Sequence, residues 1–258
     1  MSPEQIEQLG PAALALAREA GAAIMAIYAT DFENRKKDDH SPVTDADEEA
    51  EAIILAGLRR LTPKLPVIAE EMAAAGDLPD VSAGPFWLVD PLDGTREFIA
   101  RNGDFTVNIA LIVAGRPALG VVLAPARNNT AWLGLPNGAW RFAAGQTSGE
   151  PISARIAPPF GALALVSRSH REREVDAWLA RQDRMQTASI GSSLKFCSIA
   201  EGAADFYPRF ISISEWDTAA GQAVLEAAGG EVLTWEGVPL AYGKPGFRNP
   251  GFLARGRV

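Results

Sequence analysis

WLVDPLDGTREFIARNGDFTVNIALI, residues 87–112, is the stretch that decides the fold. The stretch opens within an apolar run, Phe86 to Val89, which is typical of a buried strand. Asp90 follows directly at the end of this run. Pro91 has no N–H to donate, so we expect it to stop the ladder pairing of this strand. The sequence therefore places a carboxylate where a buried strand turns into a bend.

A second carboxylate and two small polar residues follow on the same bend. Asp93 comes three positions after Asp90, and Gly94 and Thr95 open the next segment. Carboxylates are the ligands that hard divalent cations prefer, and free backbone N–H groups suit phosphate. The stretch therefore predicts a combined metal and phosphate site.

The composition is that of an ordinary globular protein, and it limits the classes of partner. The chain has 258 residues and a formal net charge of −8, which argues against nucleic acid or an anionic membrane as the main partner. The single cysteine, Cys197, excludes an internal disulfide and fits a reducing compartment. The first residues lack a basic region and an apolar region of the kind found in signal peptides, so we expect a soluble, cytoplasmic protein.

The rest of the chain predicts one compact unit with two halves, residues 1–145 and 146–258. Apolar spacing indicates helices over 3–28 and 45–61, and β-type runs over 106–113, 118–124, 131–135 and 139–142 indicate an antiparallel meander. A Gly/Ser/Pro-rich segment, 144–159, is the candidate boundary. Beyond it, strands at 162–166, 206–211 and 231–235 alternate with helices at 171–181, 194–201 and 219–228.

Several common active sites are absent from the sequence. There is no G-x-x-x-x-G-K-[ST] loop, no H-E-x-x-H pair and no G-x-S-x-G elbow, and His40 and His170 are the only histidines. An aspartyl nucleophile would need two aspartates two positions apart, whereas Asp90 and Asp93 are three apart. What remains is attack by a metal-activated water, which needs an acidic cage for two or more Mg²⁺ ions.

Five acids could supply this cage, and each also has an ordinary structural explanation. Asp217 stands where a helix N-cap belongs, and taken alone it is better explained as a cap than as a ligand. The adjacent Glu70 and Glu71 could be a solvated loop end. A further acid, Asp47, is not one of the five, because Thr44 and Asp47 have the spacing of a capping box and we interpret Asp47 as serving the helix N-terminus. Asp90 and Asp93 complete the five and are the hardest to explain as a plain turn.

The combined motifs identify a family. DPLDGT, with an EE pair before it and WDTAAG far beyond it, resembles the inositol monophosphatase superfamily of Mg²⁺-dependent, lithium-sensitive phosphatases. Within it the chain is most similar to the CysQ type of 3′(2′),5′-bisphosphate nucleotidase. The motifs that carry this likeness are SPVTDAD (41–47), DPLDGTREFIARNGDFTVNIALI (90–112), SRSH (167–170), GSSLKFC (191–197), AEGAADFYPRF (200–210) and WDTAAGQAV (216–224).

The resemblance implies roles for the acidic residues. Two or three Mg²⁺ ions would be bound by Glu70, Asp90, Asp93, Asp217 and the backbone carbonyl of Leu92. Glu70 and Thr95 would orient and deprotonate the attacking water, and Asp93 also belongs to the catalytic set.

The resemblance also implies a substrate site. The N–H groups of Gly94 and Thr95 would hold the scissile phosphate, and the nucleotide with its second phosphate would be bound by His170, Ser192, Lys195 and Arg209. The ordinary explanation for such cations is a surface charge. Ala69 and Met72 flank the EE pair where relatives often have Ser and Asp, which leaves the role of Glu71 open.

Together these features predict an α/β (α+β) fold of the sugar-phosphatase type, a layered α-β-α-β-α sandwich with an antiparallel N-terminal sheet and a C-terminal α/β half. The predicted reaction is hydrolysis of 3′-phosphoadenosine 5′-phosphate (PAP) to AMP and phosphate. The alternatives are an inositol monophosphatase or broad sugar-phosphate phosphatase, and an inactive metal-dependent nucleotide-binding regulator. The oligomeric state is left open.

Overall fold

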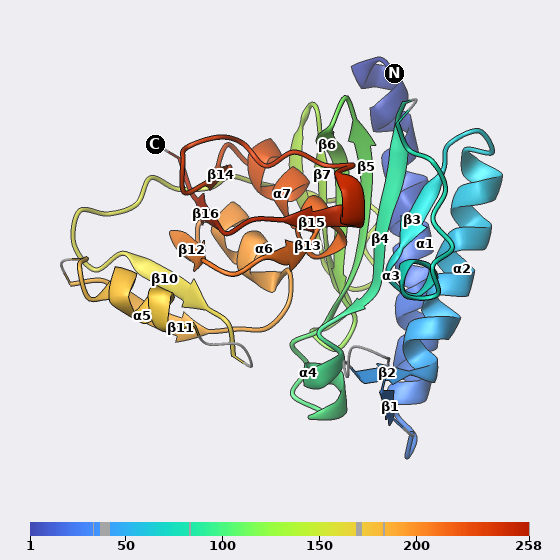
Figure 1. The fold of residues 1–258 in the computed structure, drawn as a ribbon, viewed down its shortest axis with the longest axis horizontal. Helices are drawn as coiled ribbons and strands as arrows, with labels where there is room; N and C mark the ends of the chain where they lie inside the picture. Colours follow the sequence, from blue (N-terminus) through green and yellow to red (C-terminus); the bar gives the residue numbers. More distant parts are fainter. Residues whose placement is uncertain (33, 37–41, 83, 169–171, 183, 258) are drawn as a thin grey trace.

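A computed structural model describes residues 1–257 apart from 33, 37–41, 83, 169–171 and 183. It has five layers of alternating helices and sheets (Figure 1). The first layer is a pair of helices, α1 (Pro3–Tyr28) and α2 (Asp45–Leu61), whose bounds are those expected from their apolar spacing. A small hairpin of β1 (Asn34–Lys36) and β2 (Pro42–Thr44) joins them.

The second layer is a seven-stranded sheet with the strands in sequence order. The predicted antiparallel meander is confirmed from β5 to β8. The ladder extends to β4 on one side and, within the segment predicted as a boundary, to β9 on the other, and the first strand, β3, pairs with β4 in parallel. The strands are β3 (Val67–Ala69), β4 (Phe86–Asp93), β5 (Thr106–Val113), β6 (Arg116–Ala124), β7 (Thr130–Leu135), β8 (Gly138–Phe142) and β9 (Glu150–Ile152).

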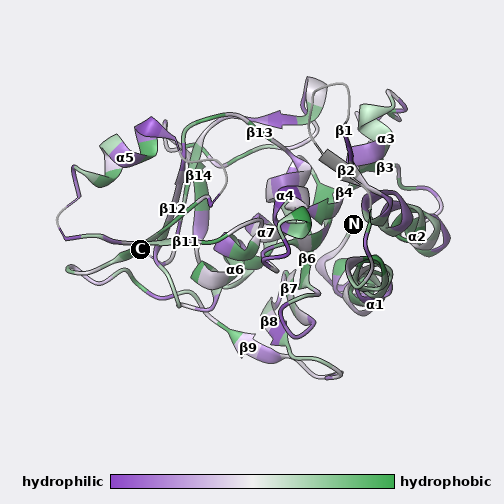
Figure 2. Ribbon diagram, turned by 90° about the horizontal axis from the view of Figure 1, so that it is seen from below, coloured by the Kyte–Doolittle hydropathy of each residue, from purple (hydrophilic) through white to green (hydrophobic). Residues whose placement is uncertain are grey.

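The third layer holds α6 (Leu194–Ala200) and α7 (Trp216–Ala227), which lie between the two sheets in Figure 2. The fourth is a five-stranded sheet in the order β11, β10, β12, β16, β14. The fifth is α5 (Arg173–Leu179). The strands of the fourth layer are β10 (Leu163–Val166), β11 (Gln186–Ser189), β12 (Phe206–Arg209), β14 (Glu231–Thr234) and β16 (Phe252–Arg255).

Short elements complete the fold. Two helices of one turn, α3 (Glu70–Ala74) and α4 (Thr95–Ile99), follow β3 and β4 directly. A small ladder pairs β13 (Ile213–Ser214) with β15 (Arg248–Asn249), and a 3₁₀ turn, η1 (Pro245–Phe247), precedes it. Neither α3 nor α4 shows in the sequence as an apolar period, because each is only five residues long.

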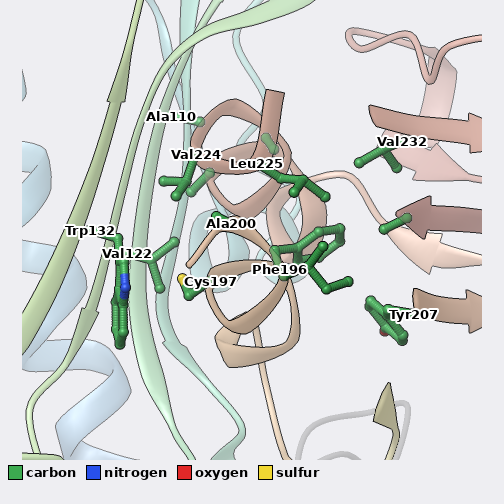
Figure 3. Packing of buried hydrophobic residues seen from close by; sticks show 14 of the residues in the cluster. Ala110, Val122, Trp132, Phe196, Cys197, Ala200, Tyr207, Val224, Leu225 and Val232 are labelled. Carbon is green, nitrogen blue, oxygen red and sulfur yellow. The ribbon is translucent and has the colours of Figure 1, made fainter. Parts of the chain in front are cut away.

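Two apolar cores hold the layers together. One lies between the paired helices and the large sheet and includes the buried face of α1. The other surrounds α6 and α7 and reaches both sheets, as Figure 3 shows for Val122 and Trp132 on one side and Val232 on the other. Because this second core joins segments from both parts of the chain, the division at residues 145 and 146 stays a prediction.

Helix α1 is, among the described residues, the one helix long and apolar enough to cross a membrane. Its apolar side chains Ala13, Ala17, Ala20 and Ile24 are fully buried in the first core. Burial of this face against α2 and the sheet is what a core helix of a globular protein shows.

Helix α7 approaches the large sheet closely because two strand positions are glycine. A Cβ added at Gly134 would lie 2.6 Å from the carbonyl oxygen of Ala223, and one added at Gly120 would lie 2.3 Å from that of Ala220. Real Cβ atoms do not approach carbonyl oxygens this closely, so a larger residue would push α7 and Asp217 away from the sheet.

We therefore expect Gly134→Ala to lower the free energy of unfolding by about 1–3 kcal/mol, the usual cost of overpacking a core. Chemical denaturation measures this directly. Gly84→Ala is the matched control, because nothing lies within 4 Å of a Cβ added there, and it should leave stability unchanged. Equal stability of the two variants would show that the close packing of α7 on the sheet does not require glycine at position 134.

Candidate active site

Three acidic side chains from distant parts of the sequence meet at one point. Glu70 comes from the start of α3, Asp90 from β4 and Asp217 from the first turn of α7, and each offers a carboxylate oxygen within 4.8 Å of the other two. Asp90 is only 1% exposed. Buried carboxylates that converge in this way repel one another unless a cation lies between them, so this donor set fits Mg²⁺.

The bend after Asp90 arises from an interruption in the β4–β5 ladder. Pairing runs to Asp90 and Asn108, stops at Pro91, and resumes at Asp93 and Thr106. The prediction that Pro91 ends the pairing is thus wrong in one respect, because the strand continues beyond it. The Leu92 N–H donates to Asp90 Oδ1 at 3.0 Å, which turns the Asp90 carboxylate back over the bend.

Asp93 lies at the second side of this bend in a network of donors. Its Oδ2 accepts hydrogen bonds from the Ser193 N–H at 2.7 Å, from Asn108 Nδ2 at 3.2 Å and from the Thr106 hydroxyl at 3.5 Å. Asn108 also donates to Ser193 Oγ at 2.9 Å. One carboxylate oxygen is therefore fixed by the protein.

Asp217 is not a helix cap. Helix α7 begins at Trp216, its N-cap is Glu215, and Asp217 lies inside the first turn. The interpretation of Asp217 as an N-cap, which was favoured for this residue taken alone, is therefore wrong. Helix α7 begins about one turn earlier than its apolar spacing indicates. The helix start instead directs the Asp217 carboxylate towards Glu70 and Asp90.

Gly94 and Thr95 follow the bend as predicted. Gly94 has φ of 98°, a left-handed conformation that disfavours other residues, and Thr95 is the first residue of α4. The Thr95 hydroxyl lies 3.2 Å from Asp47 Oδ1 and 3.4 Å from the Leu92 carbonyl oxygen. Asp47, which the sequence analysis did not place in the active site, therefore contacts the site residue Thr95.

Asp47 also forms the predicted capping box. Its Oδ2 accepts from the Thr44 N–H and from the Thr44 hydroxyl, both at 2.8 Å, and the side chain is 2% exposed. Interpretation of Asp47 as a helix-terminus residue was correct but incomplete, because one carboxylate oxygen serves the cap and the other faces Thr95. The second role of Asp47 shows in its burial, which the spacing of residues in the sequence does not reveal.

Helix α3 is held by an acid that the sequence did not single out. Glu51, from α2, accepts hydrogen bonds from the N–H groups of Glu71 at 2.8 Å and Met72 at 2.9 Å. This contact pairs two free N–H groups in the first turn of α3 and so holds the first residue of the helix, Glu70, in place. The start of α3 is therefore anchored through the backbone N–H groups of Glu71 and Met72 and not through their side chains.

A cavity of about 250 Å³ opens over these acids. Every residue that the resemblance assigns to the site lines it, apart from His170, which lies outside the described residues; Glu71, the remaining acid considered for the cage, is not among the lining residues. The assigned residues that line the cavity are Glu70, Asp90, Leu92, Asp93, Gly94, Thr95, Ser192, Lys195, Arg209 and Asp217.

The part of the cavity that Lys195 and Arg209 line is basic. Lys195 is only 4% exposed, and its Nζ donates to the carbonyl of Ser192 at 2.8 Å and lies 4.8 Å from the ring centroid of Tyr207. The Arg209 side chain is 13% exposed. The alternative explanation of these cations as surface charges is therefore wrong.

Two buried polar atoms in this part of the cavity have no hydrogen-bond partner within the described part of the chain. They are Ser192 Oγ and Arg209 Nε, both on residues that line the cavity. Buried donors are usually paired, and an unpaired one is costly. An anion with several acceptor oxygens would pair both, as a phosphate group can.

The acids have perturbed pKa values. Burial raises the pKa of Asp90 well above its usual value, and the charges of Glu70, Asp93 and Asp217 raise it further. Burial and the charges of Asp93 and Glu70 raise the pKa of Asp217 in the same way. Burial also raises the pKa of Asp93, although Lys195 and the hydrogen bonds to it act in the opposite direction.

These raised pKa values predict how stability depends on pH and Mg²⁺. Above about pH 4 the unfolded chain releases protons that folded Asp90 and Asp217 retain, so the metal-free protein loses stability as pH rises through their raised pKa values. Mg²⁺ should therefore raise the melting temperature more at about pH 8 than at about pH 5. Thermal melts with and without Mg²⁺ at both pH values measure this. An equal shift at both would contradict a metal site built on these acids.

Known proteins resemble this chain over nearly its whole length. Residues 5–253 match the model of the inositol monophosphatase family. The 3′(2′),5′-bisphosphate nucleotidase CysQ of Salmonella typhimurium is 49% identical over 240 residues, which cover 92% of this chain and 95% of that protein. CysQ of Escherichia coli (strain K12) is 48% identical with the same coverage.

Solved structures show the same fold. The crystal structure of CysQ from Bacteroides thetaiotaomicron, described as a bacterial member of the inositol monophosphatase family, superimposes with a TM-score of 0.81 and 34% identity over 96% of both chains. Inositol monophosphatase from Anabaena superimposes with a TM-score of 0.77 and 26% identity, covering 98% of this chain and 92% of that one.

Proposed function

The chain belongs to the inositol monophosphatase family, and on that premise we propose that it is a 3′(2′),5′-bisphosphate nucleotidase that hydrolyses the 3′-phosphate of PAP. The products are AMP and phosphate. The observation that carries the substrate is that two cations, the buried Lys195 and the largely enclosed Arg209, line the same cavity as the acidic cluster. A nucleotide with two phosphates can place one at the acids and one at these cations. The likeness to CysQ proteins over nearly the whole chain supports the same assignment.

The family is metal-dependent, typically on Mg²⁺, and we propose that two or three ions bind in this cavity. Glu70, Asp90, Asp93, Asp217 and the Leu92 carbonyl would hold them, since all five line the cavity. When bound, Mg²⁺ lowers the pKa of a coordinated water and offsets the charge of the phosphate.

The chain's own residues then position the reactants. The Thr95 hydroxyl donates to Asp47 Oδ1, which leaves the Thr95 oxygen to accept a hydrogen bond from the attacking water. Glu70 takes the proton of that water, and the N–H groups of Gly94 and Thr95 donate to the scissile phosphate. Ser192, Lys195 and Arg209 bind the second phosphate, together with His170 as an expected contact.

A substrate comparison tests this function. With Mg²⁺ present, the protein should release phosphate from PAP with a higher kcat/KM than from inositol 1-phosphate. The reverse ranking would favour the alternative, an inositol monophosphatase, and absence of turnover on both would favour the nucleotide-binding regulator. A cytoplasmic location follows from the predicted substrate and is part of the proposal.

Arg209→Met should separate the two substrates. A charge-assisted hydrogen bond contributes about 1.5–3 kcal/mol, so kcat/KM for PAP should fall by about 10- to 100-fold. The value for inositol 1-phosphate, which has no second phosphate, should change much less. Steady-state kinetics on both substrates measure the ratio, and Arg173→Met, at an exposed position of α5, is the control. An equal loss on both substrates would place Arg209 outside the second-phosphate site.

A further inference from the structure

Asp104 stands out because it is a fully buried acid beside the cavity to which the proposed reaction gives no role. It lies between α4 and β5 and is 1% exposed. Its Oδ2 accepts the Gly191 N–H at 3.1 Å, and Gly191 opens the turn that carries Ser192 and Ser193. The acid therefore joins the two parts of the chain at the rim of the site.

The turn held by Asp104 supports several groups of the site at once. The Ser192 carbonyl accepts from Lys195 Nζ, the Ser193 N–H donates to Asp93, and Ser192 has a strained φ of 49°. A residue in this left-handed conformation persists only where its surroundings fix it. The Gly191 N–H bond to Asp104 is one such fixed point.

The packing around Asp104 is equally tight. A Cβ added at Gly191 would lie 2.6 Å from the Asp104 carbonyl oxygen, and one added at Gly94 would lie 3.0 Å from the same oxygen. The residue thus lies between the bend that holds the scissile phosphate and the turn that faces the second phosphate. Its position sets the spacing of these two segments.

Two arginines neutralise the Asp104 carboxylate on its outer side. Arg127 pairs with Oδ1, and Arg168, at the end of β10, pairs with Oδ2 at 2.9 Å. Their side chains are 44% and 46% exposed. The carboxylate is therefore paired on its outer side while it accepts from the Gly191 N–H on its inner side.

We propose that Asp104 is a positioning residue that holds the 191–193 turn in register with the metal-binding bend and so sets the affinity for the bisphosphate nucleotide. The inference rests on the proposed function for its kinetic consequence. Its structural part, the fixing of the turn, does not depend on the substrate.

The test combines kinetics with amide hydrogen exchange on the full-length protein. Asp104→Ala should raise KM for PAP about tenfold or more, because a displaced turn moves Ser192 and Lys195, while kcat falls much less. Exchange over residues 190–194 should become at least about tenfold faster. Arg127→Met is the matched control: it removes an ion pair of Asp104 but leaves the Gly191 bond, so KM and exchange should stay close to wild type.

The outcomes separate the possibilities. Unchanged KM and exchange in folded Asp104→Ala, or an equal rise in KM in Arg127→Met, would overturn the inference. If Asp104→Ala does not fold, Gly191→Ala, which crowds the same contact, replaces it with the same expected rise, and Asp104→Asn, which can still accept the Gly191 N–H, should give a smaller rise than either. A wild-type protein that does not hydrolyse PAP would contradict the proposed function, and the exchange comparison would still decide the role of Asp104.

Discussion

Asp90→Asn is expected to lower kcat/KM for PAP by at least about 10³-fold, because a lost metal ligand removes several kcal/mol of transition-state stabilisation. Asp90 is the most enclosed acid of the convergent group, and Glu70 and Asp217 each approach it within the span of one bound ion. An amide keeps the shape of the side chain but supplies no charge. Steady-state phosphate release at saturating Mg²⁺ measures the loss.

Stability distinguishes this effect from misfolding. Because the charges of Glu70, Asp93 and Asp217 oppose ionisation of Asp90, removing its charge should leave the metal-free variant at least as stable as wild type at about pH 8. The stabilisation by Mg²⁺ should shrink in the same variant. Glu49→Gln, at an exposed acid of α2, is the control for charge alone. Activity within about tenfold of wild type in Asp90→Asn would contradict its assignment as a ligand.

Thr95→Val is expected to lower kcat for PAP by about 10²- to 10³-fold with little change in KM, the usual contribution of a positioned proton-transfer group. The substitution keeps the branched shape but removes the hydroxyl that lies 3.2 Å from Asp47 Oδ1. The N–H of residue 95 remains to bind phosphate. A water without this acceptor would attack from a less defined position.

Kinetics of Thr95→Ser and Thr30→Val complete the experiment. Serine restores the hydroxyl and should recover most of kcat, whereas Thr30, which is exposed at the end of α1, should be replaceable without effect. A rise in KM with unchanged kcat in Thr95→Val would instead assign the hydroxyl to substrate binding.

Much of the fold follows from local patterns. The bounds of α1 and α2 coincide with their apolar periods, and the meander from β5 to β8 follows from β-type runs separated by turn residues. Strands with weak patterns were missed. β11 has the sequence QTAS with all four residues exposed, and β16 is four residues long although it pairs with both β12 and β14.

The site was predictable where chemistry and motif coincide, as in the bend with Asp90, Asp93 and Thr95. The roles of the other site residues depend on their burial, which cannot be deduced from their spacing in the sequence. Lys195 looks like an ordinary surface cation until Tyr207 and the backbone carbonyls enclose it. The second oxygen of Asp47 gains its partner only because α4 packs near β2 and the start of α2.

The most direct test is to identify the product of PAP hydrolysis. We expect Mg²⁺-dependent conversion of PAP to adenosine 5′-phosphate and one equivalent of phosphate, since the proposed function places the 3′-phosphate at the acids and the 5′-phosphate at Lys195 and Arg209. Chromatography of the reaction mixture against both adenosine monophosphates resolves the products. Accumulation of adenosine 3′-phosphate, or no turnover of PAP with Mg²⁺ present, would contradict this orientation and the function built on it.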